Sequence, residues 1–475
     1  MVFPVVGGTQ STGYDIDNSV RFNRGDGADL GRAPSADGNR KTWTFSTWVK
    51  LGNIPWDKSQ DFDIFSANST NNFRDELRFD ANGKLTLLTK VSGDTANGVK
   101  GSSTRLFRDS SAWYHIVVAL DTTQATNTNG FKMYVNGVQE TISFNAYNQN
   151  ISTSFNKDGS TMSIGHRQND GGNHYDGYIS ETNFIDGTQL DASYFGETND
   201  NGVWIPKKYT GSYGTNGFFF EYQQTGTSQN SSGIGADTSG NDNHFAVTNL
   251  AATDVTVDTP TNNFATMNPL DNHYPDSILT EGNCKLVTNA SNESYNTSTI
   301  GASSGKWYCE MKHTSSNDRT DRSLFGIADT IANASGNSVY TGNVYIYRSD
   351  GNSFSGTSET SGYGSAWNST GEIIGIAMDL DNNKLYFSIN GTFQNSGNPA
   401  SGATGTGAIS ITADKTYFFI AGDLSGASIT YEMNFGNAPF AISSGNADAN
   451  GYGNFEYAVP SGYYSLCTKN LAEYG

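Results

Sequence analysis

Apolar and polar side chains alternate along most of this chain with the period of two that a β-strand requires. Within residues 41–50, Trp43, Phe45 and Val49 fall on one side of an extended segment, and Trp48 falls on the other. Short runs of this kind recur to the end of the chain. No segment keeps an apolar period of 3.6 residues for the roughly ten residues that a helix needs. The pattern predicts an all-β protein.

One element of the pattern occurs twice, because residues 113–138 are echoed by residues 373–391. Each copy has an apolar strand, a polar turn, and an alternating strand that ends in Asn-Gly. Asn136-Gly137 and Asn390-Gly391 suit a type I′ hairpin, in which both central residues take a positive φ. Two copies, one in each half of the chain, predict two antiparallel β-sandwiches in tandem.

Changes in composition along the chain predict the domain boundaries. Residues 1–18 form an irregular leader, residues 19–222 the first sandwich and residues 261–475 the second. Residues 223–260 are rich in Gly, Ser, Thr and Asn, and we interpret them as a connecting segment. Residues 243–247 within it could also be a strand that folds back on the first sandwich.

Composition and charge narrow the function. Only 35% of the 475 residues are apolar, while 12% are aromatic, so the cores must depend on large rings. The formal net charge is −19 and no basic stripe is present, which argues against binding to nucleic acid or to anionic membranes. No apolar run approaches the roughly 20 residues needed to span a bilayer, so membrane insertion is not expected.

The cysteines and the first residues of the chain indicate the cellular compartment in which the protein is made. Cys284, Cys309 and Cys467 are too few, and odd in number, for a disulfide framework, so we expect buried reduced thiols. Residues 1–7 lack the basic and apolar regions of a signal peptide. We therefore expect assembly in a cytoplasm.

Two stretches resemble known domain families. Similarity to the laminin-G/concanavalin A-like lectin superfamily is carried by residues 42–49, 112–118, 134–137, 176–184 and Leu190. Similarity to SPRY domains is carried by residues 304–310, 326–328, 375–381, 385–391 and 434–440. The resemblance implies a jelly-roll concanavalin A-like sandwich followed by a SPRY-like sandwich.

The pairing of these two domains is similar to proteins of marine tailed bacteriophages. The residues that carry this similarity are 40–44, Gly187, 195–198, 237–241 and 460–470. The resemblance implies a virion component, such as a tail fibre, an adhesin or a capsid appendage. Its implied partners are other virion proteins and a host surface glycan. No coiled-coil or β-helix segment fixes the oligomeric state, so a homo-oligomer stays open.

No catalytic group stands out. Residues 301–305 spell Gly-x-Ser-x-Gly, but a strand follows them, whereas a nucleophile elbow needs a helix there. Retaining glycosidases place two carboxylates about 5–5.5 Å apart. No Glu-x-Asp-x-x-Glu run exists, and the adjacent Asp75 and Glu76 must point to opposite faces of a strand. The sequence therefore predicts no catalytic residue, although a pair assembled from separate strands stays open.

Glu181 and Ile179 are two residues apart on one predicted strand, so their side chains point to the same face and that of Glu181 could point inward. A buried carboxylate without a partner is costly or stays protonated. The laminin-G resemblance places a glutamate at this position, which favours a structural hydrogen-bonding role over catalysis.

Calcium is the one cofactor that the resemblance suggests, since laminin-G-like domains often bind it through Asp side chains. The candidate ligands are Asp15, Asp17, Asp61, Asp63, Asp170 and Asp176. None has the spacing of an EF-hand, so each is also explained as a turn or capping residue.

Glycan binding would use exposed aromatic rings as stacking platforms. The candidates are Trp56, Tyr175 and Tyr213 in the first sandwich and Tyr345, Tyr347, Tyr363 and Trp367 in the second. In so aromatic a chain each is also explained as a core residue. We interpret the protein as a non-enzymatic virion surface protein; the alternatives are a bacterial surface or exported lectin and a glycan hydrolase.

Overall fold

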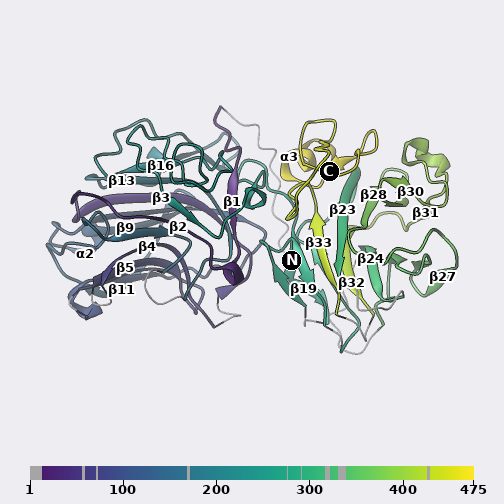
Figure 1. The fold of residues 1–475 in the computed structure, drawn as a ribbon, viewed down its shortest axis with the longest axis horizontal. Coiled ribbons are helices and arrows are strands. Elements are labelled where there is room, and N and C mark those ends of the chain that lie inside the picture. The colour runs from purple at the N-terminus through teal and green to yellow at the C-terminus, as the bar shows by residue number, and fades with distance from the viewer. Residues whose placement is uncertain are drawn as a thin grey trace. The chain divides into compact units, whose positions relative to one another are not determined.

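The computed structural model describes residues 13–475 apart from 56–58, 71–72, 92, 168–171, 275–276, 290, 316–320, 330–337 and 425–427. The described chain forms two compact units that divide between Thr261 and Asn262. Each unit consists mainly of antiparallel sheets with a few short helices (Figure 1). The predicted fold class, all-β with two tandem antiparallel sandwiches, is confirmed.

The first unit has two eight-stranded sheets. One sheet has the order β10-β9-β8-β3-β13-β1-β18, with β16 paired to β13, and the other has the order β11-β7-β6-β5-β4-β12-β2-β17. The bounds are β1 Ser19–Phe22, β2 Asp29–Arg32, β3 Thr42–Leu51, β4 Phe62–Thr70, β5 Phe73–Phe79, β6 Leu85–Lys90, β7 Val99–Ser103, β8 Trp113–Asp121, β9 Phe131–Val135, β10 Val138–Gln139, β11 Ile142–Tyr147, β12 Thr161–Ile164, β13 Gly177–Asp186, β16 Phe218–Phe220, β17 Ala246–Thr248 and β18 Val255–Thr256.

Shorter elements complete this unit. They are the hairpin β14 (Gly196–Thr198) and β15 (Trp204–Pro206), and the helices η1 Arg24–Asp26, η2 Thr95–Asn97, α2 Asn127–Gly130, η3 Ala192–Tyr194 and η4 Ala252–Asp254.

Aromatic rings fill the core of the first unit. Phe45 of β3 stacks on Phe65 of β4 at 4.5 Å between ring centroids, which joins the two sheets, and Phe65 stacks on Phe155 at 4.4 Å. Phe184 and Phe218 are stacked beside them at 5.5 Å. A chain with so few aliphatic residues thus closes its core with rings that each bury roughly 150–250 Å².

The second unit has a seven-stranded sheet, β19-β22-β32-β24-β25-β26-β27, and a nine-stranded sheet, β20-β21-β33-β23-β28-β29-β30, with β31 on β29 and β34 parallel to β23. The bounds are β19 Met267–His273, β20 Ile278–Thr280, β21 Lys285–Val287, β22 Ser294–Ser298, β23 Lys306–Ser315, β24 Ser323–Ala328, β25 Val344–Arg348, β26 Ser353–Ser355, β27 Ser358–Thr360, β28 Ile373–Asp379, β29 Lys384–Ile389, β30 Thr392–Phe393, β31 Ile409–Ser410, β32 Phe418–Asp423, β33 Thr430–Asn434, β34 Tyr464–Ser465, η5 Pro399–Thr404 and α3 Thr468–Tyr474.

Both Asn-Gly hairpins form as predicted. φ is 48° and 78° at Asn136-Gly137, between β9 and β10, and 47° and 78° at Asn390-Gly391, between β29 and β30. The side-chain oxygen of Asn136 accepts the backbone N–H of His115 at 2.8 Å, and that of Asn390 accepts the N–H of Ile373 at 3.0 Å. The repeated sequence therefore encodes one repeated device, in which the turn asparagine ties back to the preceding strand.

Residues 223–260, which the sequence suggested as a connecting segment, hold elements that pair with the first unit. β17 pairs with β2, β18 pairs with β1, and Phe245 is buried in the core. Asp258 forms a buried ion pair with Lys50 of β3 at 2.8 Å. The strand suggested within residues 243–247 is therefore present, shifted to Ala246–Thr248. Residues 1–12 of the predicted leader lie outside the described residues.

Candidate functional site

Most of the aromatic side chains predicted as sugar platforms lie inside the protein. The buried ones are Tyr175, Tyr345, Tyr347, Tyr363 and Trp367. Tyr175, for example, is fully buried and donates its hydroxyl to the backbone oxygen of Lys50 at 3.0 Å. A ring enclosed in a core cannot stack on a sugar, so the structure does not support these five as platforms. Trp56 lies outside the described residues.

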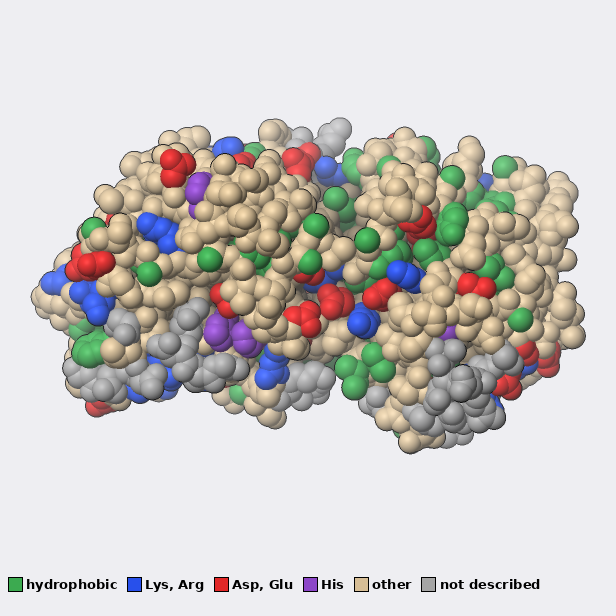
Figure 2. All heavy atoms as spheres, viewed as in Figure 1, with side chains coloured by type: hydrophobic (Ala, Val, Ile, Leu, Met, Phe, Trp, Pro, Cys, Tyr) green, Lys and Arg blue, Asp and Glu red, His purple; other side chains and the backbone are tan. Residues whose placement is uncertain are grey.

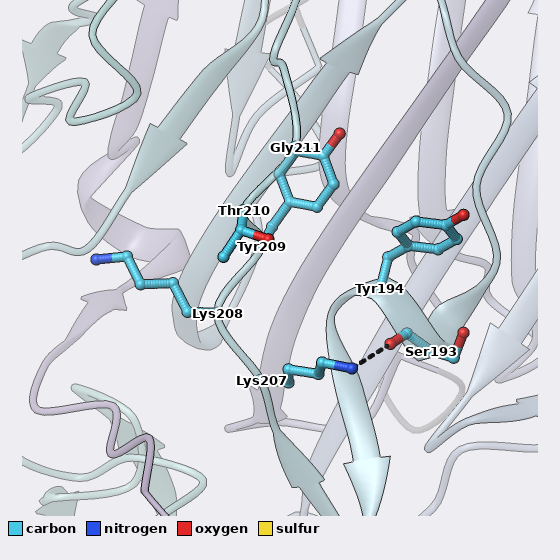
Figure 3. A pocket seen from close by; sticks show the side chains of 7 residues that line it. All are labelled: Ser193, Tyr194, Lys207, Lys208, Tyr209, Thr210 and Gly211. Atoms are coloured by element: carbon cyan, nitrogen blue, oxygen red, sulfur yellow. Dashed lines mark hydrogen bonds between the residues drawn. The ribbon is translucent and has the colours of Figure 1, made fainter.

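An exposed aromatic hollow does exist in the first unit, in a place that the sequence did not indicate. It has a volume of about 330 Å³ and is lined by Ser193, Tyr194 and residues 207–211. Tyr194 is 49% exposed, one of the few large apolar side chains at the surface. In Figure 3, the rings of Tyr194 and Tyr209 lie on two sides of the hollow, and Lys207 lies below both rings and points towards the backbone of Ser193. We refer to these residues as the tyrosine hollow.

Local interactions give the tyrosine hollow its shape. Asp191 caps η3 by accepting the backbone N–H of Ser193 at 2.9 Å, which fixes the turn that presents Tyr194. On the opposite side, the ring of Tyr209 stacks on Phe195 at 5.2 Å, and the N–H of Lys207 bonds to the oxygen of Phe195 at 3.0 Å. The hollow is thus preformed, as expected of a binding site.

The charges around the hollow nearly balance. Lys207 lies 3.8 Å from Glu197, and Lys208 lies 3.3 Å from Glu221, with both lysine side chains about half exposed. Such pairs are worth little to stability, which leaves their polar atoms available to a ligand. The exposed ring of Tyr194, flanked by ammonium and carboxylate groups, suits a molecule with an apolar face and many hydroxyls.

Tyr213 was also predicted to contact sugar, and the structure places it behind the hollow. Its ring meets that of Tyr209 edge to face at 5.1 Å, and its hydroxyl donates to Oδ1 of Asn183 at 3.0 Å. Burial raises the pKa of Tyr213 well above its ordinary value, with a further contribution from the nearby Glu181. Tyr213 therefore supports Tyr209 rather than forming the exposed surface.

Glu181 of β13 is buried, in the position from which the sequence predicted a hydrogen-bonding role. Burial raises the pKa of its carboxyl group to about 8, opposed by the neighbouring polar side chains of Tyr14 and Asn183. The acid is therefore largely protonated at neutral pH, as expected for a carboxyl group in a poorly solvated place.

The predicted calcium ligands do not come together. Asp15 and Asp17 are exposed in the segment before β1, and Asp176 accepts the side-chain amide of Asn53 at 2.8 Å. Asp170 lies outside the described residues. Among the residues that the structure describes, no three His, Cys, Asp or Glu side chains gather in a way that could hold a metal ion.

The other two calcium candidates belong to a charged cluster on the second sheet. Asp61 pairs with Arg78 at 3.0 Å, and Glu76 pairs with Arg78 at 2.5 Å and with Arg74 at 2.7 Å. Asp63 lies opposite Arg78 in the β4–β5 ladder, so its side chain shares a face with Glu76. Burial raises the pKa of Asp63 well above its ordinary value, and the charge of Glu76 adds to this. The chain thus brings together two carboxyl groups from separate strands, which single-strand patterns could not reveal.

The surface has no concentrated positive charge on the face that is drawn, and the helices are short. On the face drawn in Figure 2, uncharged polar side chains and backbone predominate, and blue Lys and Arg side chains are scattered rather than gathered into a stripe. No helix among the described residues is long and apolar enough to cross a membrane.

Residues 23–193 match the family model Laminin_G_3, of the concanavalin A-like lectin/glucanases superfamily. The matched region lies within the first unit. All residues that line the tyrosine hollow except Ser193 come after the matched region. No curated protein matches the chain.

Several solved structures show similarity to parts of the chain. The SPRY domain of human HERC1 is 14% identical with a TM-score of 0.29, covering 35% of this chain and 96% of its own. A heptameric SAP-like pentraxin from Limulus polyphemus is 17% identical with a TM-score of 0.27, covering 38% and 80%. A human SPRY domain is 14% identical with a TM-score of 0.23, covering 34% and 94%.

Proposed function

We propose that this protein is a non-enzymatic recognition protein that binds a glycan in the tyrosine hollow of its first unit. The observation that carries the proposal is the exposed ring of Tyr194 on one side of a preformed hollow, with the largely buried ring of Tyr209 forming the wall on another side. Sugar rings present apolar C–H faces that stack on aromatic rings, while their hydroxyls bond to charged and polar groups. Lys207 and Glu197 supply a donor and an acceptor at the edge of the hollow.

The wider biological setting is part of the same proposal. We place the protein on the particle of a tailed bacteriophage, as a tail fibre, adhesin or capsid appendage that contacts other virion proteins and a host surface glycan. The resemblance of residues 237–241 and 460–470 to phage proteins supports this setting. Labelling of virions with antibody to this chain, followed by electron microscopy, tests it; particles without label would contradict it.

Glycan binding is tested with the full chain on an array of bacterial surface polysaccharides and their oligosaccharide fragments. We expect binding to at least one glycan and a loss of about tenfold in Tyr194→Ala, because an aromatic contact is worth about 1.4 kcal/mol. Phe73→Ala removes a comparably exposed ring from β5 and serves as the matched control. Absence of any binding, or equal binding by both variants, would refute the proposal.

Hydrolysis is the competing function, and the shared face of Asp63 and Glu76 is the observation that favours it. Each glycan bound on the array is incubated with the protein and assayed for reducing sugar. We expect none to be released. Sustained release that is lost in Glu76→Gln would replace the binding proposal with a hydrolase.

A further inference from the structure

Both charged side chains that line the tyrosine hollow are cations. Lys207 and Lys208 belong to the lining, whereas Glu197 and Glu221, the carboxylates that balance them, do not. The chain as a whole has 47 acidic and 28 basic residues, so a lining with two lysines and no acid departs from its composition. The hollow is therefore a locally positive site on an acidic protein.

The two lysines differ in how fully their charges are used. The ammonium group of Lys208 lies 5.4 Å from the centroid of the Phe219 ring and 3.3 Å from Oε1 of Glu221. Its cation–π contact and its ion pair are thus both made within the protein. In Figure 3, Lys208 points away from the rings of Tyr194 and Tyr209. Its charge is therefore directed away from a ligand in the hollow.

Within the part of the chain that the structure describes, Lys207 has only long polar contacts. Its ammonium group lies 3.4 Å from the backbone oxygen of Ser193 and 3.8 Å from a carboxylate oxygen of Glu197. A charge-assisted hydrogen bond is shorter, at about 2.7–2.9 Å. An ammonium group has several N–H donors, and this side chain is 49% exposed. Lys207 therefore keeps donors for a group that enters the hollow.

The backbone holds Lys207 in place although its ammonium group is loosely bound. The preceding residue, Pro206, is the last residue of β15, and the N–H of Lys207 bonds to the oxygen of Phe195 at 3.0 Å. The hairpin is anchored by Trp204, whose indole N–H donates to Nδ1 of His115 at 3.0 Å. The base of the side chain is thus fixed beside the hollow, while its charged end can adjust to a ligand.

We propose that Lys207 selects acidic glycans, in which the sugar that stacks on Tyr194 carries a carboxylate or a sulfate ester. The inference rests on the proposed glycan-binding function and names the ligand class of the same site. The ligand anion takes the place of Glu197 beside Lys207, and little stabilisation is lost because exposed ion pairs contribute little. Next to the Tyr194 ring, which excludes part of the water, the new ion pair is stronger than one in open solvent.

The net charge of −19 does not oppose this strongly. At physiological ionic strength the field of an exposed charge decays over about 8 Å, so distant carboxylates contribute little. Close to the hollow, Asp191 accepts the N–H of Ser193 at 2.9 Å, and Glu221 pairs with Lys208. Glu197 is consequently the acid with which a ligand anion competes.

The ligand class is tested by removing the charge from the glycan. The full chain is titrated with each acidic polysaccharide of the array, and with the same polysaccharide after reduction of its carboxyl groups to alcohols or removal of its sulfate esters. We expect at least one charged form to bind about tenfold more tightly than its neutral form, the worth of a hydrogen bond to a charged group. The treatment that abolishes the preference identifies the anion.

Two failures of this titration are distinguishable. Equal affinity for charged and neutral forms would overturn the selection of acidic glycans and leave the glycan-binding function intact. Absence of binding to every glycan would refute that function, and the inference with it.

A matched pair of variants separates Lys207 from general effects of charge. Lys207→Gln should weaken binding to the acidic form about tenfold more than binding to the neutral form. Lys415→Gln is the control, because Lys415 of the second unit is 42% exposed and lies 3.7 Å from Asp329, so the same charge is lost from a similar pair. It should leave the affinity unchanged. Equal losses in the two variants would overturn the role of Lys207.

The displacement of Glu197 gives an effect of opposite sign. Glu197→Gln removes the competing carboxylate, so the acidic form should bind about threefold more tightly. The advantage of the parent chain over Lys207→Gln should also shrink as sodium chloride rises from about 0.05 M to about 0.5 M. Unchanged or weaker binding by Glu197→Gln, or an advantage that does not depend on salt, would contradict the proposed ion pair.

Discussion

The indole N–H of Trp204 donates a hydrogen bond to Nδ1 of His115 at 3.0 Å. Because Nδ1 must be the acceptor, the proton of the neutral imidazole resides on Nε2, which lies 2.9 Å from Oγ of Ser46. His115 therefore donates to Ser46 and cannot remove its proton. In a catalytic triad the third residue accepts from the histidine, so this arrangement reverses the direction that nucleophilic catalysis requires.

Ser46 should consequently be inert. We expect no labelling of the folded chain by a fluorophosphonate probe, and we expect Ser46→Ala to lower the free energy of unfolding by about 1 kcal/mol, the worth of one buried hydrogen bond. Mass spectrometry of the probe-treated protein and urea denaturation check the two parts. A covalent adduct on Ser46 would show that the hydrogen-bond directions assigned here are reversed.

The same histidine should make the fold sensitive to acid. Burial lowers the pKa of His115 from 6.5 to about 3, so the folded state favours the neutral ring. The stabilisation is complete above pH 6.5 and is lost as the pH falls towards 3, at about 1.4 kcal/mol per unit. Urea denaturation of the parent chain and of His115→Gln across this window should show the difference between them shrinking with acidity. A difference in stability that stays constant with pH would contradict the lowered pKa of His115.

Glu181 should act in the opposite direction at higher pH. The folded state holds its proton up to a pH of about 8, whereas an unfolded glutamate loses it near 4.5. The parent chain therefore loses stability as the pH rises from 4.5 to 8, and the loss ceases above that. Glu181→Gln removes this dependence, so its stability relative to the parent should increase by several kcal/mol across the window. Parallel stability curves for the two proteins would refute this.

Removal of one partner of the buried ion pair of Lys50 and Asp258 should lower the free energy of unfolding strongly, whereas replacement of both partners should lower it little. Its side chains are 1% and 0% exposed, and the indole of Trp113 also donates to Asp258 at 3.1 Å. Removal of one partner leaves an uncompensated buried charge, so Lys50→Met should cost about 3–5 kcal/mol. The double variant Lys50→Met/Asp258→Leu should recover most of that loss. Thermal and chemical denaturation of the three proteins measure it, and equal losses in the single and double variants would count against the pair.

The fold could be predicted because its signals are local. Asn136-Gly137 and Asn390-Gly391 need positive φ at both positions, and few residues other than Asn and Gly accept that geometry. Alternation along β3 likewise follows from side chains that point to opposite faces in turn. These rules depend on neighbours in the sequence, so the chain alone is sufficient to apply them.

The binding surface could not be predicted, because burial depends on contacts between distant segments. Tyr347 and Tyr194 look equivalent in the sequence, yet one is fully buried in the second unit and the other is exposed on η3. No local pattern marks the hollow, because adjacent lysines such as Lys207 and Lys208 are common on any protein surface. The alternation of side chains between the two faces of a strand is also interrupted at Glu181, because the bulge between Ser180 and Asn183 changes which face each residue takes.

The joint between the two units has a practical consequence for protein engineering. The hydroxyl of Thr261 donates a hydrogen bond to the backbone oxygen of Ile16 and accepts one from the backbone N–H of Ile16. The side-chain oxygen of the next residue, Asn262, accepts the backbone N–H of Lys469. Adjacent residues are thus anchored in different sandwiches, and no spacer separates them. A chimaera that exchanges one sandwich for a foreign module should be spliced at this peptide bond, because a junction placed in the glycine-rich stretch upstream would divide the first sandwich from its own last strands.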